Sequence, residues 1–100
     1  MTTKFQEKVY EIVRKVPKGK VTTYKDVSKI LRKKSYRAVG NALNKNPYAP
    51  KVPCHRVVKS NGKVGGFVKG TNKKIQILKK EGIQTEKGKI DLKKYRFKFT

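Results

Sequence analysis

Residues 23–46 of this 100-residue chain read TYKDVSKILRKKSYRAVGNALNKN and contain two apolar runs separated by a basic break. Within each run the apolar residues are adjacent or three to four positions apart, which places them on one face of a helix. These residues are Val27, Ile30 and Leu31 in the first run and Ala38, Val39, Ala42 and Leu43 in the second. Two short helices with a brief link predict a helix-turn-helix, although ordinary helical bundles contain the same pattern.

Capping signals set the limits of these two helices. Thr23, with Asp26 three positions later, is a candidate N-terminal cap for the first helix, which is expected to end near Arg32-Lys33-Lys34. The second helix is expected from about Tyr36 to Lys45. It stops at Asn46-Pro47, because the residue before a proline avoids the helical conformation.

Upstream, a further amphipathic helix is expected from about Phe5 to Lys15. Its apolar face consists of Phe5, Val9, Ile12, Val13 and Val16. Thr3 and Gln6 have the spacing of a capping box, and Pro17 and Gly19 end the helix.

Downstream, the loop of residues 46–53 contains three prolines and leads to Cys54-His55-Arg56 and then to the apolar pair Val57-Val58. Ser60-Asn61-Gly62 is a turn signal. We therefore expect a β-hairpin in which Val57-Val58 pairs with the segment at Val64.

The last third of the chain contains another helical pattern, with Thr71 as its expected cap and Gly82 at its C-terminal end. Its apolar positions are Ile75, Ile77 and Leu78. Residues 83–100 alternate apolar and charged side chains at their end, which predicts a strand in a basic tail that solvates the domain. The fold class expected is mainly α: one domain with a winged-helix-like helix-turn-helix and a short β-hairpin.

The composition restricts the class of partner. The chain has 28 Lys and Arg against 6 Asp and Glu, a net charge of +22, which calls for a polyanionic partner. No stretch approaches the roughly 18 apolar residues of a membrane span, and the N-terminus is no secretory signal, so an intracellular protein is expected. A single cysteine and a single histidine cannot supply an intramolecular disulfide or the ligands of a structural zinc site.

The one cysteine is the candidate nucleophile. Cys54 is followed by His55 and Arg56, and cationic neighbours favour the thiolate that performs nucleophilic chemistry. The alternative is a buried structural cysteine, because consecutive side chains on an extended segment point to opposite faces.

The segment Pro53-Cys54-His55-Arg56-Val57-Val58 resembles the active-site motif of the O6-alkylguanine-DNA alkyltransferases, which move an alkyl group from guanine to their own cysteine. Further segments match that family in order and close to its spacing. They are Phe5-Gln6-x-x-Val9-Tyr10, Pro17-x-Gly19-Lys20-Val21-Thr22-x-Tyr24, Arg37-Ala38-Val39-Gly40-Asn41-Ala42-Leu43, Asn46-Pro47 and Glu81-Gly82. The resemblance covers roughly residues 5–82.

The resemblance implies the roles of four site residues. Cys54 would accept the alkyl group, His55 would deprotonate it through a water, and Glu81 would orient His55. Asn46 would brace the helix-turn-helix against the active-site loop. Taken without the resemblance, His55 reads as a core histidine, Glu81 as a solvated glutamate and Asn46 as a helix stop. No cofactor or metal is implied.

The resemblance also implies a DNA interface. Arg37 resembles the arginine that fills the gap left by the extruded nucleotide, and Tyr24 the residue that crowds the adjacent phosphate. The second helix of the motif enters the minor groove, where Ala38, Gly40 and Ala42 supply small groove-facing positions and Asn41 belongs to the same DNA-binding segment. Tyr36 departs from the family, since the residue before the arginine is commonly small.

The pocket for the guanine is expected to include Tyr24, Val57, Phe67 and Val68. Phe67 stands where many members have tyrosine, so the aromatic wall is kept and a hydroxyl is lost. Val68 occupies a loop position where small residues are frequent.

The function expected is single-turnover repair: a monomer binds double-stranded DNA, flips O6-alkylguanine out and transfers the alkyl group irreversibly to Cys54. The catalytic domain would act alone here, without the N-terminal domain that most relatives carry. Two alternatives stay open. One is a recognition protein that binds alkylguanine without repair, in which tryptophan typically replaces the cysteine, and the other is a general basic DNA binder.

Overall fold

The computed structural model describes residues 3–32, 36–48, 51–65 and 70–99. Phe67 and Val68, expected in the pocket, and Lys33-Lys34, expected at a helix end, lie outside these residues. No helix in the described ranges is long and apolar enough to cross a membrane.

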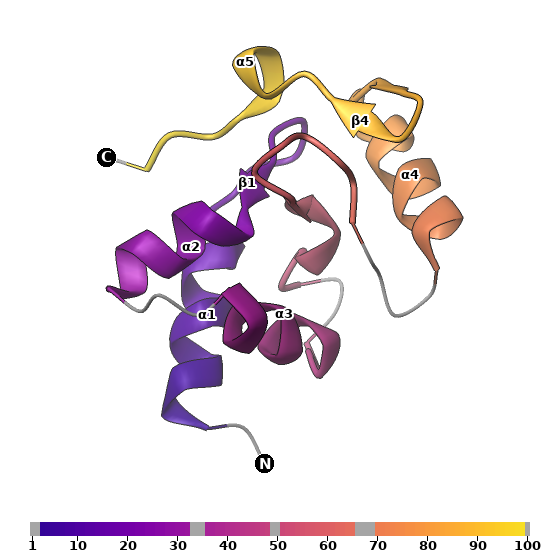
Figure 1. The fold of residues 1–100 in the computed structure, drawn as a ribbon. Helices are drawn as coiled ribbons and strands as arrows, with labels where there is room; N and C mark the ends of the chain where they lie inside the picture. Colours follow the sequence, from indigo (N-terminus) through magenta and orange to yellow (C-terminus); the bar gives the residue numbers. More distant parts are fainter. Residues whose placement is uncertain (1–2, 33–35, 49–50, 66–69, 100) are drawn as a thin grey trace.

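Three helices form the N-terminal half and enclose the larger core. They are α1 (Lys4–Arg14), α2 (Tyr24–Leu31) and α3 (Tyr36–Asn44), and all three pack on one another (Figure 1). Their shared core consists of Val9, Tyr10, Ile12, Val13, Val27, Val39, Ala42, Leu43, Val52 and Val57. The hydroxyl of Tyr10 donates to the carbonyl oxygen of Ala42 at 2.6 Å, which fixes α1 against the helix-turn-helix pair α2–α3.

The expected caps explain where α1 and α2 begin. Thr3 and Gln6 form both hydrogen bonds of the capping box. Thr23 accepts the N–H of Asp26 at 3.0 Å, and α2 ends at Arg32, which adopts the left-handed conformation with φ of 56°. The limits expected for these helices and for α3 are therefore confirmed within one residue.

The strand pairing differs from the expected hairpin. The turn at residues 60–62 is present, since the N–H of Gly62 donates to Lys59 at 2.9 Å. The N–H of Lys59 also donates to Lys63 at 2.9 Å, but the expected pairing does not extend back to β2 (Val57–Val58), which instead pairs in parallel with β1 (Thr22–Thr23). Parallel pairing joins segments more than thirty residues apart, and local turn signals do not reveal it.

Helix α4 (Thr71–Lys80) begins without the side-chain cap expected from Thr71. Gly70 occupies the cap position, and the hydroxyl of Thr71 donates instead to the carbonyl oxygen of Gly65 at 3.3 Å. The expected end at Gly82 is confirmed, because Gly82 has φ of 89° and its N–H donates to Lys79 at 3.0 Å.

The tail is folded, which corrects the expectation of a solvated extension ending in a strand. An antiparallel hairpin, β3 (Thr85–Glu86) and β4 (Lys89–Ile90), leads into the short helix α5 (Leu92–Tyr95). A second core, separate from the helical one, holds it in place. That core consists of Val21, Val58, Val64, Leu78, Ile83, Ile90 and Tyr95.

Beyond α5 the chain crosses back over the N-terminal half (Figure 1). Tyr95 accepts the N–H of Val21 at 2.9 Å, and the N–H of Phe97 donates to Val21 at 2.7 Å. Arg96 forms a two-pronged ion pair with Asp26 in the first turn of α2, at 2.6 and 2.8 Å. The tail is therefore a structural part of the fold and touches the helix-turn-helix directly.

We expect Ile90→Ala to lower the free energy of unfolding by about 2–5 kcal/mol, because Ile90 is 4% exposed and its truncation leaves a cavity in the second core. Urea denaturation followed by circular dichroism measures the change. Lys93→Ala, at an exposed position of α5, is the control and is expected to stay within about 0.5 kcal/mol of wild type. Equal stability of the two variants would contradict the conclusion that the tail is folded and stabilises the protein through the second core.

Candidate functional site

Cys54 lies on a single 3-10 turn, η1 (Cys54–Arg56), directly after Pro53. This turn replaces the extended segment on which Cys54 and His55 would point to opposite faces. The thiol is free and half-buried, whereas His55 is 6% exposed. The turn is held by the N–H of Arg56 donating to Pro53 at 2.9 Å.

The carboxylate of Glu81, at the end of α4, joins His55 and Arg56. His55 Nε2 lies 3.1 Å from Glu81 Oε2, and Arg56 Nε donates to Glu81 Oε1 at 3.0 Å while a second guanidinium nitrogen reaches Oε2. Arg56 also donates to the carbonyl oxygen of Val16 at 2.8 Å. The structure thus brings together Glu81 and His55 as expected. Arg56 is a partner that the sequence reasoning did not assign.

The protonation states follow from these contacts. Burial would raise the pKa of Glu81, but hydrogen bonds from Arg56 and His55 outweigh it and the pKa is lowered, so Glu81 is ionised. Burial lowers the pKa of His55, and the hydrogen bond and charge of Glu81 oppose this only in part. A neutral imidazole beside an ionised carboxylate donates from Nε2, which leaves Nδ1 as its proton acceptor.

Lys74 is the site residue that the sequence reasoning missed. Its side chain, on α4, is 1% exposed, and Nζ donates to the carbonyl oxygen of Val57 at 2.7 Å. Nζ also lies 5.9 Å from the centre of the Tyr24 ring. Burial lowers the pKa of Lys74 to about 8, opposed by the charge of Cys54. The only signal in the sequence is a lysine at the helical position preceding Leu78 by one turn, on the apolar face.

Tyr24 opens α2 and lies next to the thiol region. Burial raises the pKa of its phenol, and the charge of Cys54 adds to this shift. A Cβ at Gly65 would lie 3.7 Å from the hydroxyl of Tyr24, so the loop after β2 passes close to the Tyr24 side chain. Tyr24 and Cys54 both pack against the helical core, and the expected place of Tyr24 in a guanine pocket stays a prediction.

Asn46 links the end of α3 to the loop before Cys54. Its side-chain amide donates to Val52 at 2.8 Å, and its oxygen accepts the N–H of Tyr48 at 2.9 Å. This geometry is what a brace between the helix-turn-helix and the active-site loop requires. Val57, expected in the pocket, is fully buried and contributes its carbonyl oxygen to Lys74.

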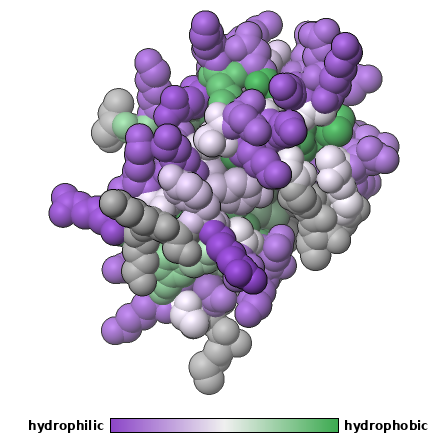
Figure 2. All heavy atoms as spheres, in the orientation of Figure 1, coloured by the Kyte–Doolittle hydropathy of each residue, from purple (hydrophilic) through white to green (hydrophobic). Residues whose placement is uncertain are grey.

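The outer face of α3 has the features of a nucleic-acid contact. Arg37 and Asn41 are exposed, and Ala38 and Gly40 are half-buried beside them. Ala42, expected to face the groove, is 1% exposed in the helical core, so that expectation is wrong. Figure 2 shows hydrophilic side chains over most of the visible face, in keeping with the net charge of +22.

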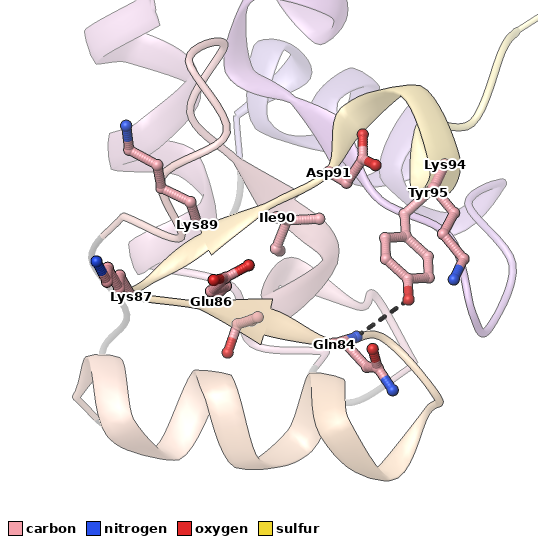
Figure 3. Close-up of a pocket in the computed structure, with 9 residues that line it drawn as sticks. Gln84, Glu86, Lys87, Lys89, Ile90, Asp91, Lys94 and Tyr95 are labelled. Carbon is pink, nitrogen blue, oxygen red and sulfur yellow. Dashed lines mark hydrogen bonds between the residues drawn. The ribbon is translucent and has the colours of Figure 1, made fainter.

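A separate hollow of about 700 Å³ lies between the β3–β4 hairpin and α5 (Figure 3). Its lining consists of Gln84, Thr85, Glu86, Lys87, Lys89, Ile90, Asp91, Lys94 and Tyr95. None of these is a nucleophilic thiol or an imidazole, and charged groups of both signs face it. Nowhere in the described ranges do three His, Cys, Asp or Glu side chains gather as metal ligands.

Comparison with known proteins gives consistent matches. Residues 4–83 match the family described as "6-O-methylguanine DNA methyltransferase, DNA binding domain". A methylated-DNA–protein-cysteine methyltransferase of Metallosphaera sedula is 48% identical over 81 residues, covering 81% of this chain and 51% of the relative. The corresponding protein of Thermococcus sibiricus is 45% identical over 85 residues, covering 84% and 47%. The chain thus spans about half the length of these relatives.

Two solved structures are also similar to this chain. The Mycobacterium tuberculosis protein OGT in complex with DNA superposes with a TM-score of 0.78 and 35% identity, over 82% of this chain and 51% of that one. Schizosaccharomyces pombe Atl1, in complex with damaged DNA containing O6-carboxymethylguanine, superposes with a TM-score of 0.86 and 29% identity. That match covers 98% of this chain and 99% of Atl1.

We expect Lys74→Met to remove a specific pH dependence of stability. Because the folded pKa of Lys74 is about 8 and the ordinary value is 10.5, the unfolded state binds more protons between these values. Wild-type stability therefore rises with pH in that window. Relative to Lys74→Met, the free energy of unfolding of the wild type should increase by about 2 kcal/mol between about pH 7.5 and about pH 10. Urea denaturation at the two pH values measures it.

Lys79→Met, on the exposed side of the same helix, is the matched control for this pH effect. Its stability relative to wild type should be the same at both pH values. If the two variants showed the same pH dependence, the charge of Lys74 would not be the buried one.

Proposed function

The chain belongs to the 6-O-methylguanine DNA methyltransferase family, in its DNA-binding domain, and from this we propose that it repairs DNA by moving the alkyl group of O6-alkylguanine onto Cys54. The observation that carries the proposal is that Cys54, His55 and Arg56 share one turn, and that Glu81 at the end of α4 bonds to both His55 and Arg56. A thiol, a neutral base and an ionised orienting group are the parts of an activated nucleophile.

Extrusion of the target base is the first step. O6 of a paired guanine cannot reach a half-buried thiol, so the nucleotide rotates out of the stack at a cost of about a few kcal/mol. Arg37, exposed on α3, fills the space that the base leaves. Tyr24, at the start of α2 and close to Cys54, lies against the backbone of the extruded nucleotide and crowds its phosphate.

Alkyl transfer follows at sulfur. The thiol proton of Cys54 passes through a water to Nδ1 of His55, whose Nε2 is held by Glu81. Sulfur then attacks the alkyl carbon and the carbon–O6 bond breaks. The departing guanine takes one proton from water, and His55 returns the thiol proton to water, so the protons balance. The product is a thioether, which these groups cannot cleave, so each protein acts once. No metal or cofactor enters the balance of this reaction.

A second candidate function is recognition of alkylguanine in DNA without alkyl transfer. It is favoured by the likeness to S. pombe Atl1, which superposes on this chain with a TM-score of 0.86 and was solved in complex with damaged DNA containing O6-carboxymethylguanine. Cys54 itself favours transfer, because binding alone requires no thiol at this position. In either function we propose that residues 1–100 act as one domain on double-stranded DNA.

We expect the intact mass of the protein to rise by one methylene after mixing with a duplex that contains O6-methylguanine, at one modification per protein. Peptide mapping should place the added group on the peptide that contains Cys54. Cys54→Ser should bind the duplex with similar affinity and stay unmodified. Tight binding by the wild type with no mass change would favour the recognition function, and modification spread over lysines would contradict both.

We expect Arg37→Ala to slow repair of duplex DNA by about tenfold or more, because the variant lacks the group that offsets base unstacking. Its reaction with free O6-benzylguanine, which needs no extrusion, should stay within about twofold of wild type. Lys29→Ala, an exposed change on α2, is the control for lost positive charge. Single-turnover rates with both substrates measure the difference, and equal losses on the two would assign Arg37 another role.

A further inference from the structure

Three large hydrophobic side chains in the described part of the chain are strongly exposed: Tyr36 at 53%, Ile30 at 44% and Tyr48 at 37%. Tyr36 is the most exposed, and it begins α3. Full burial of a large apolar side chain stabilises a fold by about 1.5–3 kcal/mol, and an exposed aromatic ring lacks most of this stabilisation. The exposed position of Tyr36 on α3 therefore needs an explanation.

Tyr48 is explained by its contacts within the fold. Its hydroxyl donates to Glu7 at 2.7 Å, and its ring meets Tyr10 edge-on at 5.6 Å between centres. The guanidinium of Arg14 lies 6.0 Å above the same ring. The side chain of Tyr36, in contrast, shows no hydrogen bond or ring contact with any residue in the described ranges.

The place of Tyr36 on α3 shows which surface it extends. Side chains in the first turn of a helix point toward its N-terminus, so Tyr36 and its exposed neighbour Arg37 both project at that end of α3. Gly40 lies four residues later, on the same side as Tyr36. A Cβ built on Gly40 would meet no atom within 4 Å, so the side of the helix next to the Tyr36 ring is open.

We propose that Tyr36 stacks on a DNA base beside the gap left by the extruded nucleotide, as a second wedge next to Arg37. This inference rests on the proposed function, since it requires α3 to lie against DNA. The ligand class is a nucleobase in a duplex that contains a gap in its stack.

Charge and shape favour a base over a protein partner. A nucleobase offers a flat face for the tyrosine ring, and the anionic DNA backbone suits Arg37 and Lys45, which are exposed at the two ends of α3. Base–aromatic stacking is indifferent to sequence because every base has a π face. Tyr36 therefore adds affinity for the distorted duplex without adding sequence preference.

The proposal separates two kinds of site in the duplex. In intact DNA the neighbouring bases are stacked on each other, and the ring gains little from contact. At a missing base, the exposed face of the neighbour is free to receive it. Tyr36 should therefore matter more for a duplex with an abasic position than for a continuous one.

The test uses the full chain and an unreactive duplex that contains one tetrahydrofuran abasic residue. Tyr36→Ala should lower the affinity for this duplex by about fivefold or more, the loss of one base–aromatic stack. Affinity for the continuous duplex should change by less than about twofold. Tyr36→Phe, which keeps the ring, should behave as wild type on both, and Ile30→Ala serves as the control for lost exposed apolar surface.

Two further measurements complete the test. A 2-aminopurine placed next to the abasic residue should be quenched by wild type and Tyr36→Phe but not by Tyr36→Ala. Reaction of all variants with free O6-benzylguanine reports on the proposed function by itself. Equal affinity of Tyr36→Ala and wild type for the abasic duplex, or equal losses on both duplexes, would overturn the stacking proposal even where Cys54 is alkylated normally.

Discussion

The guanidinium of Arg56 connects three parts of the chain that are distant in sequence. It donates to the carbonyl oxygen of Val16, beyond the end of α1, and to the carboxylate of Glu81, at the end of α4. The backbone of Arg56 belongs to the turn that holds Cys54. Removing one partner of such a partly buried pair leaves an uncompensated charge, which typically costs about 3–5 kcal/mol. The position of the thiol relative to both halves of the fold therefore depends on this contact.

The same contact determines the electrostatics of the site. With Glu81 kept ionised by Arg56, the imidazole of His55 is held by its Nε2 and stays neutral because it is buried. Lys74 brings a second cation into the interior, and its ammonium is satisfied by the carbonyl oxygen of Val57. A neutral imidazole and a buried ammonium are therefore both part of the site that contains the Cys54 thiol.

The tail contributes to this arrangement from outside the site. Ile90 and Tyr95 close the second core, and Arg96 pairs with Asp26 in the first turn of the helix that carries Tyr24. A pair in which Arg96 remains about half exposed adds little energy by itself. Together with the two backbone bonds to Val21, however, it fixes the direction of α2 relative to the strand β1.

Much of this protein is determined locally. The capping box of Thr3 and Gln6, the cap at Thr23 and the stop at Gly82 depend on residues within one turn of each other, so spacing alone locates these helix ends. The excess of 22 positive charges and the cysteine motif are likewise properties of the sequence itself. The charge indicates a polyanionic partner, the cysteine is a candidate nucleophile, and the resemblance to the alkyltransferases narrows the partner to DNA before any coordinates are considered.

Tertiary structure decided what depends on distant segments. Packing between segments thirty or more residues apart determines the pairing of β2 with β1, the fold of the tail and the burial of Ala42. Local sequence patterns do not reveal such packing. Lys74 reads as a surface lysine in the sequence, and only the closure of α4 onto η1 buries it beside Tyr24. The physical reason is that burial is a property of the assembled fold: a charged side chain becomes part of a site when other elements exclude water from it and supply its hydrogen-bond partners.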